Sequence, residues 1–494
     1  MSNTEKILCC FTLGGQQYLS ELLLDAEKSS LNLHSRHQIP YDPEPHSLYG
    51  ESLDYQKISL FECVGDPPDS AGLYPDIAHT RSSFPHYAVL GQRHIAENEK
   101  AFKSISFRTD DLELVFANQG LFGSAAHAPD HQNLKAWLES CSPNANITSN
   151  NDHIPFHHAA DQNFVEHDIS VGFFSVAVEL KATANSYKEI HYVKTTVATL
   201  RFKERKSLTE ALDGIIVAQH FFTIIAGRYQ GVHSLLADVE NPKLSVSQNE
   251  SDKMRIHWSF APTCSTHLAS NLRDIPVTPQ VDSDEFYTLF RQWSERHDRW
   301  LPARLRIINW QKAGRVFDEN RLVAAANAFD ILPYSAYPET GDLSEETLEA
   351  RRQCKALIRA LRSGPEREQA LNTLSFWGGK NLKLKVLSRS KIIHDSFGDY
   401  FVDLDLVLTT AINMRNYFVH GTNKFGYEHY EHLMPFLTDA LEFAFIASDL
   451  IECGWNAKQW SSKYLGYSHP LAAFYRRYTS ELGNFVLAKQ NAQK

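Results

Sequence analysis

Two different hydrophobic patterns divide the chain. In the first half, β-branched and aromatic runs with partial alternation predict strands at residues 57–64, 86–90, 102–107, 171–180, 189–202 and 254–260. One helix is expected among them, because Ser207 and Glu210 stand at capping-box spacing before an apolar run with helical spacing, and Gly227 can end it. A single helix after a set of strands is typical of an α+β or sandwich-like domain that carries the helix on a sheet.

From about residue 284 the apolar residues recur with helical spacing. We expect helices at residues 286–297, 320–331, 345–361, 385–397, 401–420 and 430–452. Pro276 and Pro279 flank a polar segment, which favours a domain boundary there. The pattern therefore predicts an α+β chain with a β-rich domain and its packed helix over residues 1–275, followed by an all-α bundle over residues 280–494.

The end of the predicted helix 401–420 is the most informative stretch. One helical face carries the apolar residues Leu404, Leu408, Ala411 and Phe418. Arg415 falls on this face, where a guanidinium is costly to bury unless it is paired or faces a functional cavity. Asn416 and His420 are four residues apart on a neighbouring face, so the amide could orient the imidazole. Gly421 is the expected C-cap.

Arginine and histidine together suit metal-free RNA cleavage. A histidine can move protons near neutral pH, an arginine stabilises charge on phosphate oxygens, and RNA carries its own nucleophile in the 2′-hydroxyl. On an ideal helix the five-residue spacing places Arg415 and His420 roughly 140° apart, so we expect two copies of the helix to meet across a two-fold axis. A structural alternative is a buried arginine paired with an acid, beside a histidine that favours its helix end.

These residues resemble a known motif. The segment 415–420 is similar to the R-polar-x-x-x-H motif of HEPN ribonucleases, in which the three polar residues form a composite site at a dimer interface. The helical run from about Asp284, with the motif on a late helix and a long helix after it, looks like the HEPN domain of ApeA-type abortive-infection proteins. Residues 84–91 and 102–108, with Leu112, look like the ApeA N-terminal domain.

The resemblance implies a function. Arg415, Asn416 and His420 would be the catalytic residues of a HEPN bundle, and residues 1–275 would sense or restrain it. The protein would be an endoribonuclease of bacterial anti-phage defence that forms a dimer or higher oligomer, needs no cofactor, responds to a phage-derived trigger and cleaves cellular RNA such as tRNA. The rival reading is a non-catalytic HEPN-like module for RNA binding or dimerisation, with a ligand-recognising N-terminal domain.

Length and composition limit the alternatives. A chain of 494 residues predicts two or three domains. Its apolar stretches are shorter than a membrane span, the longest considered being residues 215–226, and its start lacks a signal-peptide layout, so we expect a cytoplasmic protein that does not engage a membrane. The 7 cysteines form no C-x-x-C pair, which favours reduced thiols.

The net charge of −10 is unevenly distributed. Residues 1–275 carry 22 basic and 33 acidic side chains, whereas residues 276–494 carry 27 and 26. Within the second half, a basic run at residues 380–391 contains no acid, so Lys383, Lys385 and Arg389 are candidate RNA-binding residues. The alternative is a solvated helix face over packed leucines.

Other chemistries find little support in the sequence. Histidines and acids gather at His153, His157, His158, Asp161, Glu166, His167 and Asp168, but their spacing matches no established zinc pattern, so we expect no metal. Neither the Gly-rich patterns of nucleotide-binding loops nor the G-x-S-x-G elbow of serine hydrolases occurs. The Asn/Ser/Pro-rich residues 142–152 predict a loop.

Overall fold

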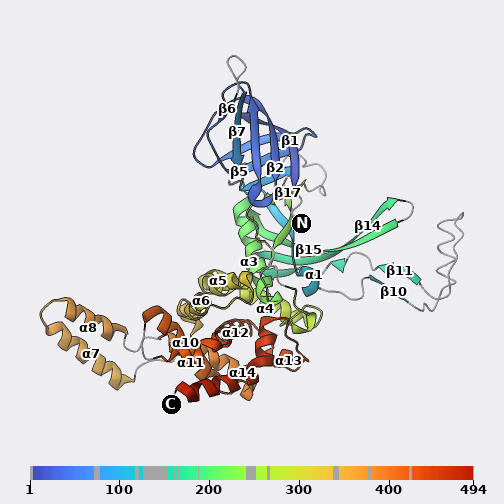
Figure 1. The fold of residues 1–494 in the computed structure, drawn as a ribbon. Coiled ribbons are helices and arrows are strands. Elements are labelled where there is room, and N and C mark those ends of the chain that lie inside the picture. The colour runs from blue at the N-terminus through green and yellow to red at the C-terminus, as the bar shows by residue number, and fades with distance from the viewer. Residues whose placement is uncertain are drawn as a thin grey trace. The chain divides into compact units, whose positions relative to one another are not determined.

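The computed structural model describes residues 4–71, 78–116, 122–125, 154–158, 162–163, 166–186, 189–240, 252–263, 268–337, 344–376, 381–421 and 425–492. By its internal contacts the chain divides into two compact units. The first, the β-rich unit, comprises Met1–Ile215 and Val232–Pro262, and the second, the helical unit, comprises Ile216–Gly231 and Thr263–Lys494. The predicted fold class, β-rich then helical, is confirmed, whereas the predicted loop 142–152 lies outside the described residues (Figure 1).

The β-rich unit begins with a closed barrel. Its strands pair in a ring, in the order β1 (Glu5–Leu13), β2 (Gln16–Leu24), β3 (Ser30–Ser35), β7 (Ala78–Phe84), β5 (Lys57–Gly65) and β4 (His46–Ser52), and β4 pairs back with β1. Alternate side chains point inward and form an apolar core that includes Phe11, Leu22, Leu33 and Leu60. Figure 1 shows β1, β2, β5 and β7 side by side.

A sheet continues from one edge of β5. The first residues of β5 pair with β8 (Tyr87–Gly91), while Val64 and Gly65 pair with β7. Beyond β8 follow β17 (Asp252–Trp258), β16 (Val232–Val239), β9 (Phe102–Thr109), β15 (Glu189–Lys206) and β14 (Gly172–Ser186). Smaller elements are β6 (Asp69–Ala71), α1 (Leu112–Val115), β10 (Phe122–Ala125), β11 (Ile154–His158), β12 (Gln162–Asn163) and β13 (His167–Ile169). The six predicted strands are all present.

The predicted helix after the strands is α3 (Leu208–Ala226), which contributes residues to both units. Its capping box is formed, because the Ser207 N–H donates to Glu210 Oε2 at 2.9 Å and the Glu210 N–H donates to Ser207 Oγ at 3.4 Å. Gly227 follows in the left-handed region, with φ 73°. The helix is longer than the apolar stretch we expected, and its length and composition would suit a membrane span, but 78% of that span is buried inside the fold, as in a core helix.

The helical unit is built around α12 (Met434–Glu452), which packs against α6 (Glu319–Asp330), α9 (Leu382–Phe397), α10 (Leu404–His420) and α14 (Pro470–Ala492). The other helices are α4 (Ser283–Glu295), α5 (His297–Ala313), α7 (Glu345–Ala360), α8 (Pro365–Phe376), α11 (Tyr427–Tyr430) and α13 (Ala457–Ser461). Short 3-10 turns lie at Leu272–Asp274, Tyr334–Ala336, Gly398–Tyr400 and Glu431–Leu433 in this unit, and at Ala26–Lys28 in the β-rich unit. All six helices predicted for this half are present. Five of the helices in the described residues, α5, α8, α11, α13 and α14, were not predicted.

The helical unit includes residues before Pro276, where the sequence favoured a boundary. The carboxylate of Asp274 is buried and accepts hydrogen bonds from the Gly466 N–H at 2.6 Å and the Ser468 N–H at 2.9 Å. The Trp455 indole N–H donates to the carbonyl oxygen of Pro276 at 3.1 Å. These long-range bonds hold the segment against the connections between α12, α13 and α14, almost 200 residues later in the chain, which local composition does not reveal.

Candidate active site

Helix α10 leads from the core of the helical unit to solvent. Leu404, Leu408 and Ala411 on its first turns are fully buried, whereas the residues of the last turn are half-buried or exposed. Gly421 ends the helix as predicted, in the left-handed conformation with φ 61° and ψ 36°, and its N–H donates to the Tyr417 carbonyl at 2.9 Å. The core stripe therefore ends in a polar segment at the protein surface.

Amide oxygens hold the Arg415 guanidinium. Its Nε and Nη2 atoms donate to Asn327 Oδ1 on α6 at 3.2 and 2.8 Å, and its Nη1 donates to Asn416 Oδ1 at 3.0 Å. Among the described residues no carboxylate lies within ion-pair distance of Arg415, so the predicted structural alternative, an arginine paired with an acid, is not seen there. Amides fix the group without neutralising it, which leaves its positive charge to act on an anion.

His420 is exposed, and its Nε2 lies 3.3 Å from Arg415 Nη1. Because a guanidinium only donates hydrogen bonds, this contact makes Nε2 an acceptor and leaves the ring proton on Nδ1. Our inference that one helix cannot bring the two groups together is wrong. The helical angle describes where the side chains start, and the long arginine side chain reaches back to the imidazole. The helical spacing is therefore no longer a reason to expect a dimer, and the dimer stays a prediction.

Contrary to our expectation, the Asn416 amide does not orient the His420 imidazole. Its described hydrogen bond is to Arg415 rather than to His420, so it orients the guanidinium. Asn327, which shares this task, was not found from the sequence. The available signal was an amide inside the apolar pattern of α6, where Ala326, Ala328 and Phe329 are fully buried around it.

An aromatic cluster adjoins the motif. The Tyr417 and Tyr427 rings stack with centroids 5.2 Å apart and an interplanar angle of 7°, and Phe418 meets Tyr427 edge to face. Phe425 lies against Tyr417 and stacks on Tyr430. The first four of these rings are half-exposed, so the motif borders on an aromatic surface of the kind on which unpaired bases stack.

The prediction that Arg389 on α9 belongs to an RNA-binding basic patch is wrong. This side chain is only 1% exposed and pairs with Glu452 at 2.7 Å and Ser448 Oγ at 2.9 Å, because its face of α9 packs on α12. Lys385 is half-buried and pairs with Asp330 at 2.8 Å. Lys383 is exposed, and Lys380 lies outside the described residues. Of the three candidates this leaves one exposed lysine, and with Lys391 there are two in the described part of the run, too few for a phosphate-tracking surface.

The described residues contain no group of three or more histidine, cysteine or acidic side chains that could hold a metal ion. His153 and Asp161 of the noted cluster lie outside these residues. Glu166 instead pairs with Arg201, whose Nε donates to it at 2.8 Å, and Asp168 pairs with Lys203 at 2.6 Å. The two acids therefore serve ion pairs on the sheet surface.

Comparison with known families matches most of the chain. Residues 13–293 match the model described as ApeA N-terminal domain 1, and residues 323–459 match the model described as Apea-like HEPN. The second match includes Asn327, Arg415, Asn416 and His420. Neither a search of curated proteins nor a search of solved structures found a match.

Proposed function

Because this chain belongs to the ApeA-type anti-phage proteins with a C-terminal HEPN domain, we propose that it is a metal-independent endoribonuclease. It cleaves cellular RNA with Arg415, Asn416 and His420 as its active-site residues. HEPN domains of this kind are a nuclease family. The observation that supports the proposal best is that a guanidinium without a carboxylate partner among the described residues lies 3.3 Å from an exposed imidazole. Both groups lie at the surface end of α10, where a long polymer can reach them.

The proposed reaction needs no divalent ion. His420 accepts the proton of a ribose 2′-hydroxyl, the 2′-oxygen attacks the adjacent phosphorus, and the bond from phosphorus to the 5′-oxygen breaks. Arg415 stabilises the negative charge that builds up on the phosphate oxygens. The leaving 5′-oxygen takes up a proton, which a second His420 from a partner copy could supply. The products are a 2′,3′-cyclic phosphate and a 5′-hydroxyl.

The surroundings of the site support RNA as the substrate. Asn327 and Asn416 fix the arginine before substrate binds, so little reorganisation is needed when charge develops. The half-exposed rings of Tyr417 and Tyr427 offer a stacking surface for an unpaired base next to the cleaved bond. We therefore expect single-stranded loops, such as those of tRNA, to be cut in preference to duplex.

The test is cleavage of labelled RNA by the full chain in the presence of EDTA. We expect wild-type protein to yield 2′,3′-cyclic phosphate ends, and His420→Ala and Arg415→Ala each to lose activity by about 10²–10⁴-fold. The control is His432→Ala, an exposed histidine outside the motif, which should leave the rate unchanged.

Folded wild-type protein that binds RNA and never cuts it would establish the rival, a non-catalytic RNA-binding or dimerisation module. Cleavage that persists in folded His420→Ala protein would refute the assigned residues.

A further inference from the structure

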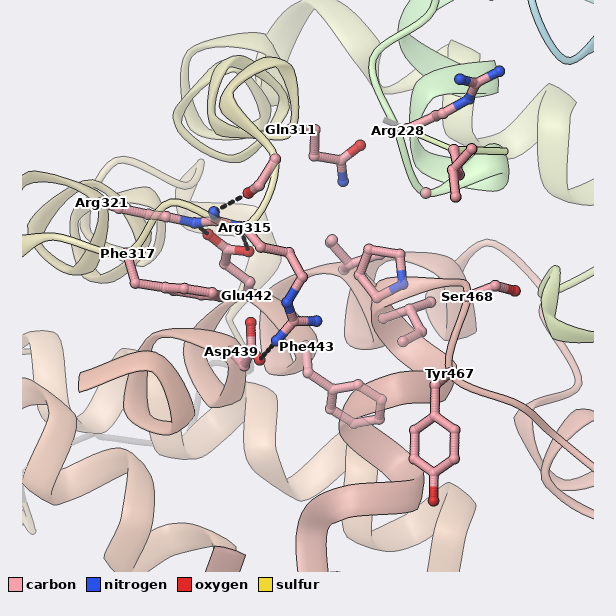
Figure 2. A pocket seen from close by; sticks show the side chains of 16 residues that line it. Arg228, Gln311, Arg315, Phe317, Arg321, Asp439, Glu442, Phe443, Tyr467 and Ser468 are labelled. Carbon is pink, nitrogen blue, oxygen red and sulfur yellow. Dashed lines mark hydrogen bonds and ion pairs between the residues drawn. The ribbon is translucent and has the colours of Figure 1, made fainter. Parts of the chain in front are cut away.

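A second site of interest lies in the helical unit, apart from the Arg415 motif. It is a cavity of about 360 Å³ between the end of α5, the start of α6, α12 and the first residues of α14, which we call the α5–α12 cavity (Figure 2). Its volume falls within the range of small-molecule sites. None of the residues Asn327, Arg415, Asn416 and His420 lines it. The proposed ribonuclease reaction therefore does not explain it.

One buried polar group in the wall is unsatisfied. Gln311 on α5 is 7% exposed, and its Oε1 has no hydrogen-bond partner among the described residues. Figure 2 shows its amide extending from the helix toward the open space between Arg315 and Arg228. An unpaired buried carbonyl typically costs about 1–3 kcal/mol, so a donor from a bound molecule would relieve a real penalty.

Two arginines of the wall differ in how many of their N–H groups are already hydrogen-bonded. Arg321 donates to Glu442 at 2.7 and 2.9 Å and to the carbonyl oxygens of Gly314 and Val316, so its hydrogen-bonding capacity is almost filled. Arg315 is 58% exposed and lies 3.7 Å from Asp439, too far for a hydrogen bond. Its donors can therefore turn to an anion at little cost.

Two further features favour an anion with hydroxyl groups beside it. The 23-residue helix α14 begins at the cavity with Pro470, which has no N–H, and Leu471, whose N–H donates to His469 Nδ1 at 3.1 Å. These two residues therefore contribute the positive end of the helix dipole, which attracts phosphate, and no direct hydrogen bond. Asp439 lines the cavity next to Arg315 and is already paired with Arg477 at 3.1 Å. Its second carboxylate oxygen can accept bonds from ribose hydroxyls.

We propose that the α5–α12 cavity binds a nucleoside 5′-monophosphate. Arg315 holds the phosphate near the positive end of the α14 dipole, Asp439 accepts bonds from the ribose, and the Gln311 amide pairs with the edge of the base. Phe443, Ile446 and Leu471 form the apolar wall against which the base packs. An arginine side chain holds the phosphate, so the site needs no glycine-rich loop, in agreement with the absence of such a pattern from the sequence.

The experiment is calorimetric titration of the full chain with AMP and with GMP. We expect binding of at least one of them with a dissociation constant on the order of 10–100 µM, and weaker binding of the matching nucleoside, which lacks the phosphate. Arg315→Ala should weaken binding by about 10-fold or more, as for loss of a charge-assisted hydrogen bond. Gln311→Leu should also weaken binding, while raising the melting temperature of the free protein because the unpaired carbonyl is gone.

Two controls make the outcome decisive. Arg306→Ala removes an exposed arginine of α5 that does not line the cavity, and His420→Ala tests whether the nucleotide binds at the cleavage motif instead; both should bind like wild type. The proposal is overturned if neither nucleotide binds below about 1 mM. It is equally overturned if binding survives both Arg315→Ala and Gln311→Leu, or if His420→Ala abolishes it.

Discussion

At the scale of single residues, the unusual feature is an arginine fixed by amides. A carboxylate partner would hold Arg415 as firmly but would neutralise it, whereas the Asn327 oxygen accepts two of its N–H groups and keeps the charge. Asn327 is thus a positioning residue, one step removed from the reacting phosphate. Its effect should be seen in the rate of the bound complex rather than in RNA affinity.

We predict that Asn327→Ala lowers the single-turnover cleavage rate by about 10-fold, less than His420→Ala, with little change in RNA binding. Asn327→Asp should be at least as harmful although it keeps the hydrogen bonds, because an ion pair would offset the guanidinium charge. The measurement is cleavage in EDTA alongside binding to a non-cleavable 2′-deoxy RNA. An Asn327→Asp variant that cuts faster than wild type would show that orientation, not charge, limits the reaction.

At the scale of elements, the sequence pattern predicted those helices, strands and caps that depend on interactions between neighbouring residues. Strand β5 and helix α12 end within a residue of the expected positions, and the capping box of α3 is formed as expected. The pattern missed α5, since Pro302 and several charged residues interrupt its periodicity. It also missed the closure of the barrel, because the pairing of β1 with β4 joins segments about forty residues apart.

The candidate site likewise has residues that the sequence identifies and residues that only helix packing brings together. Arg415, Asn416 and His420 share six consecutive residues, so the sequence alone points to them. Asn327 reaches Arg415 from 88 residues away, and Arg389 is buried only because α9 packs on α12. Both facts depend on how helices pack, which spacing along one helix cannot show.

A buried charge network joins α5 to α12 and supports the bundle. Arg304 is 1% exposed, donates to both carboxylate oxygens of Asp449 at 2.9 and 3.2 Å, and lies 3.8 Å from the ring centroid of Trp293. Arg296 also reaches Asp449, at 3.1 Å. Removal of Arg304 would therefore leave the buried Asp449 carboxylate with Arg296 as its one ion-pair partner among the described residues.

We predict that Arg304→Met destabilises the protein by about 3 kcal/mol, in the range for breaking a buried ion pair. Thermal unfolding of the full chain measures it. Arg306→Met, two residues along α5 but exposed, is the matched control and should shift the melting temperature little. Equal shifts for the two variants would mean that the network does not stabilise the fold.

At the scale of the whole molecule, the proposed reaction needs both a base and an acid. One His420 cannot accept and donate a proton in the same step, so a second copy is the simplest source of the acid. We predict that the protein is at least a dimer, by analytical ultracentrifugation, and that its cleavage rate per subunit falls when it is diluted below the dissociation constant. A fully active monomer would contradict this.

The stability of the whole molecule should also depend on pH, because several histidines are buried. The pKa is lowered to about 4 at His220 and His469 and to about 3 at His297, chiefly by burial and, at His220 and His297, also by the Arg304 charge. Unfolded histidine titrates at about 6.5, so below that pH the unfolded chain binds more protons than the folded one. Their contribution is present above pH 6.5 and is lost as the pH falls toward 4.

Asp439 opposes this trend, since burial raises its pKa to about 6 and its proton binds first to the folded state. At about pH 5.5 each of the three buried histidines lowers the free energy of unfolding by roughly 1 kcal/mol, and Asp439 raises it by less. We therefore predict a lower melting temperature at about pH 5.5 than at about pH 7.5. His469→Gln should reduce the difference between the two melting temperatures, even if it lowers both, whereas His432→Gln, at an exposed site, should leave the difference unchanged. A His469→Gln protein with the full wild-type difference would show that this histidine does not resist protonation in the folded state.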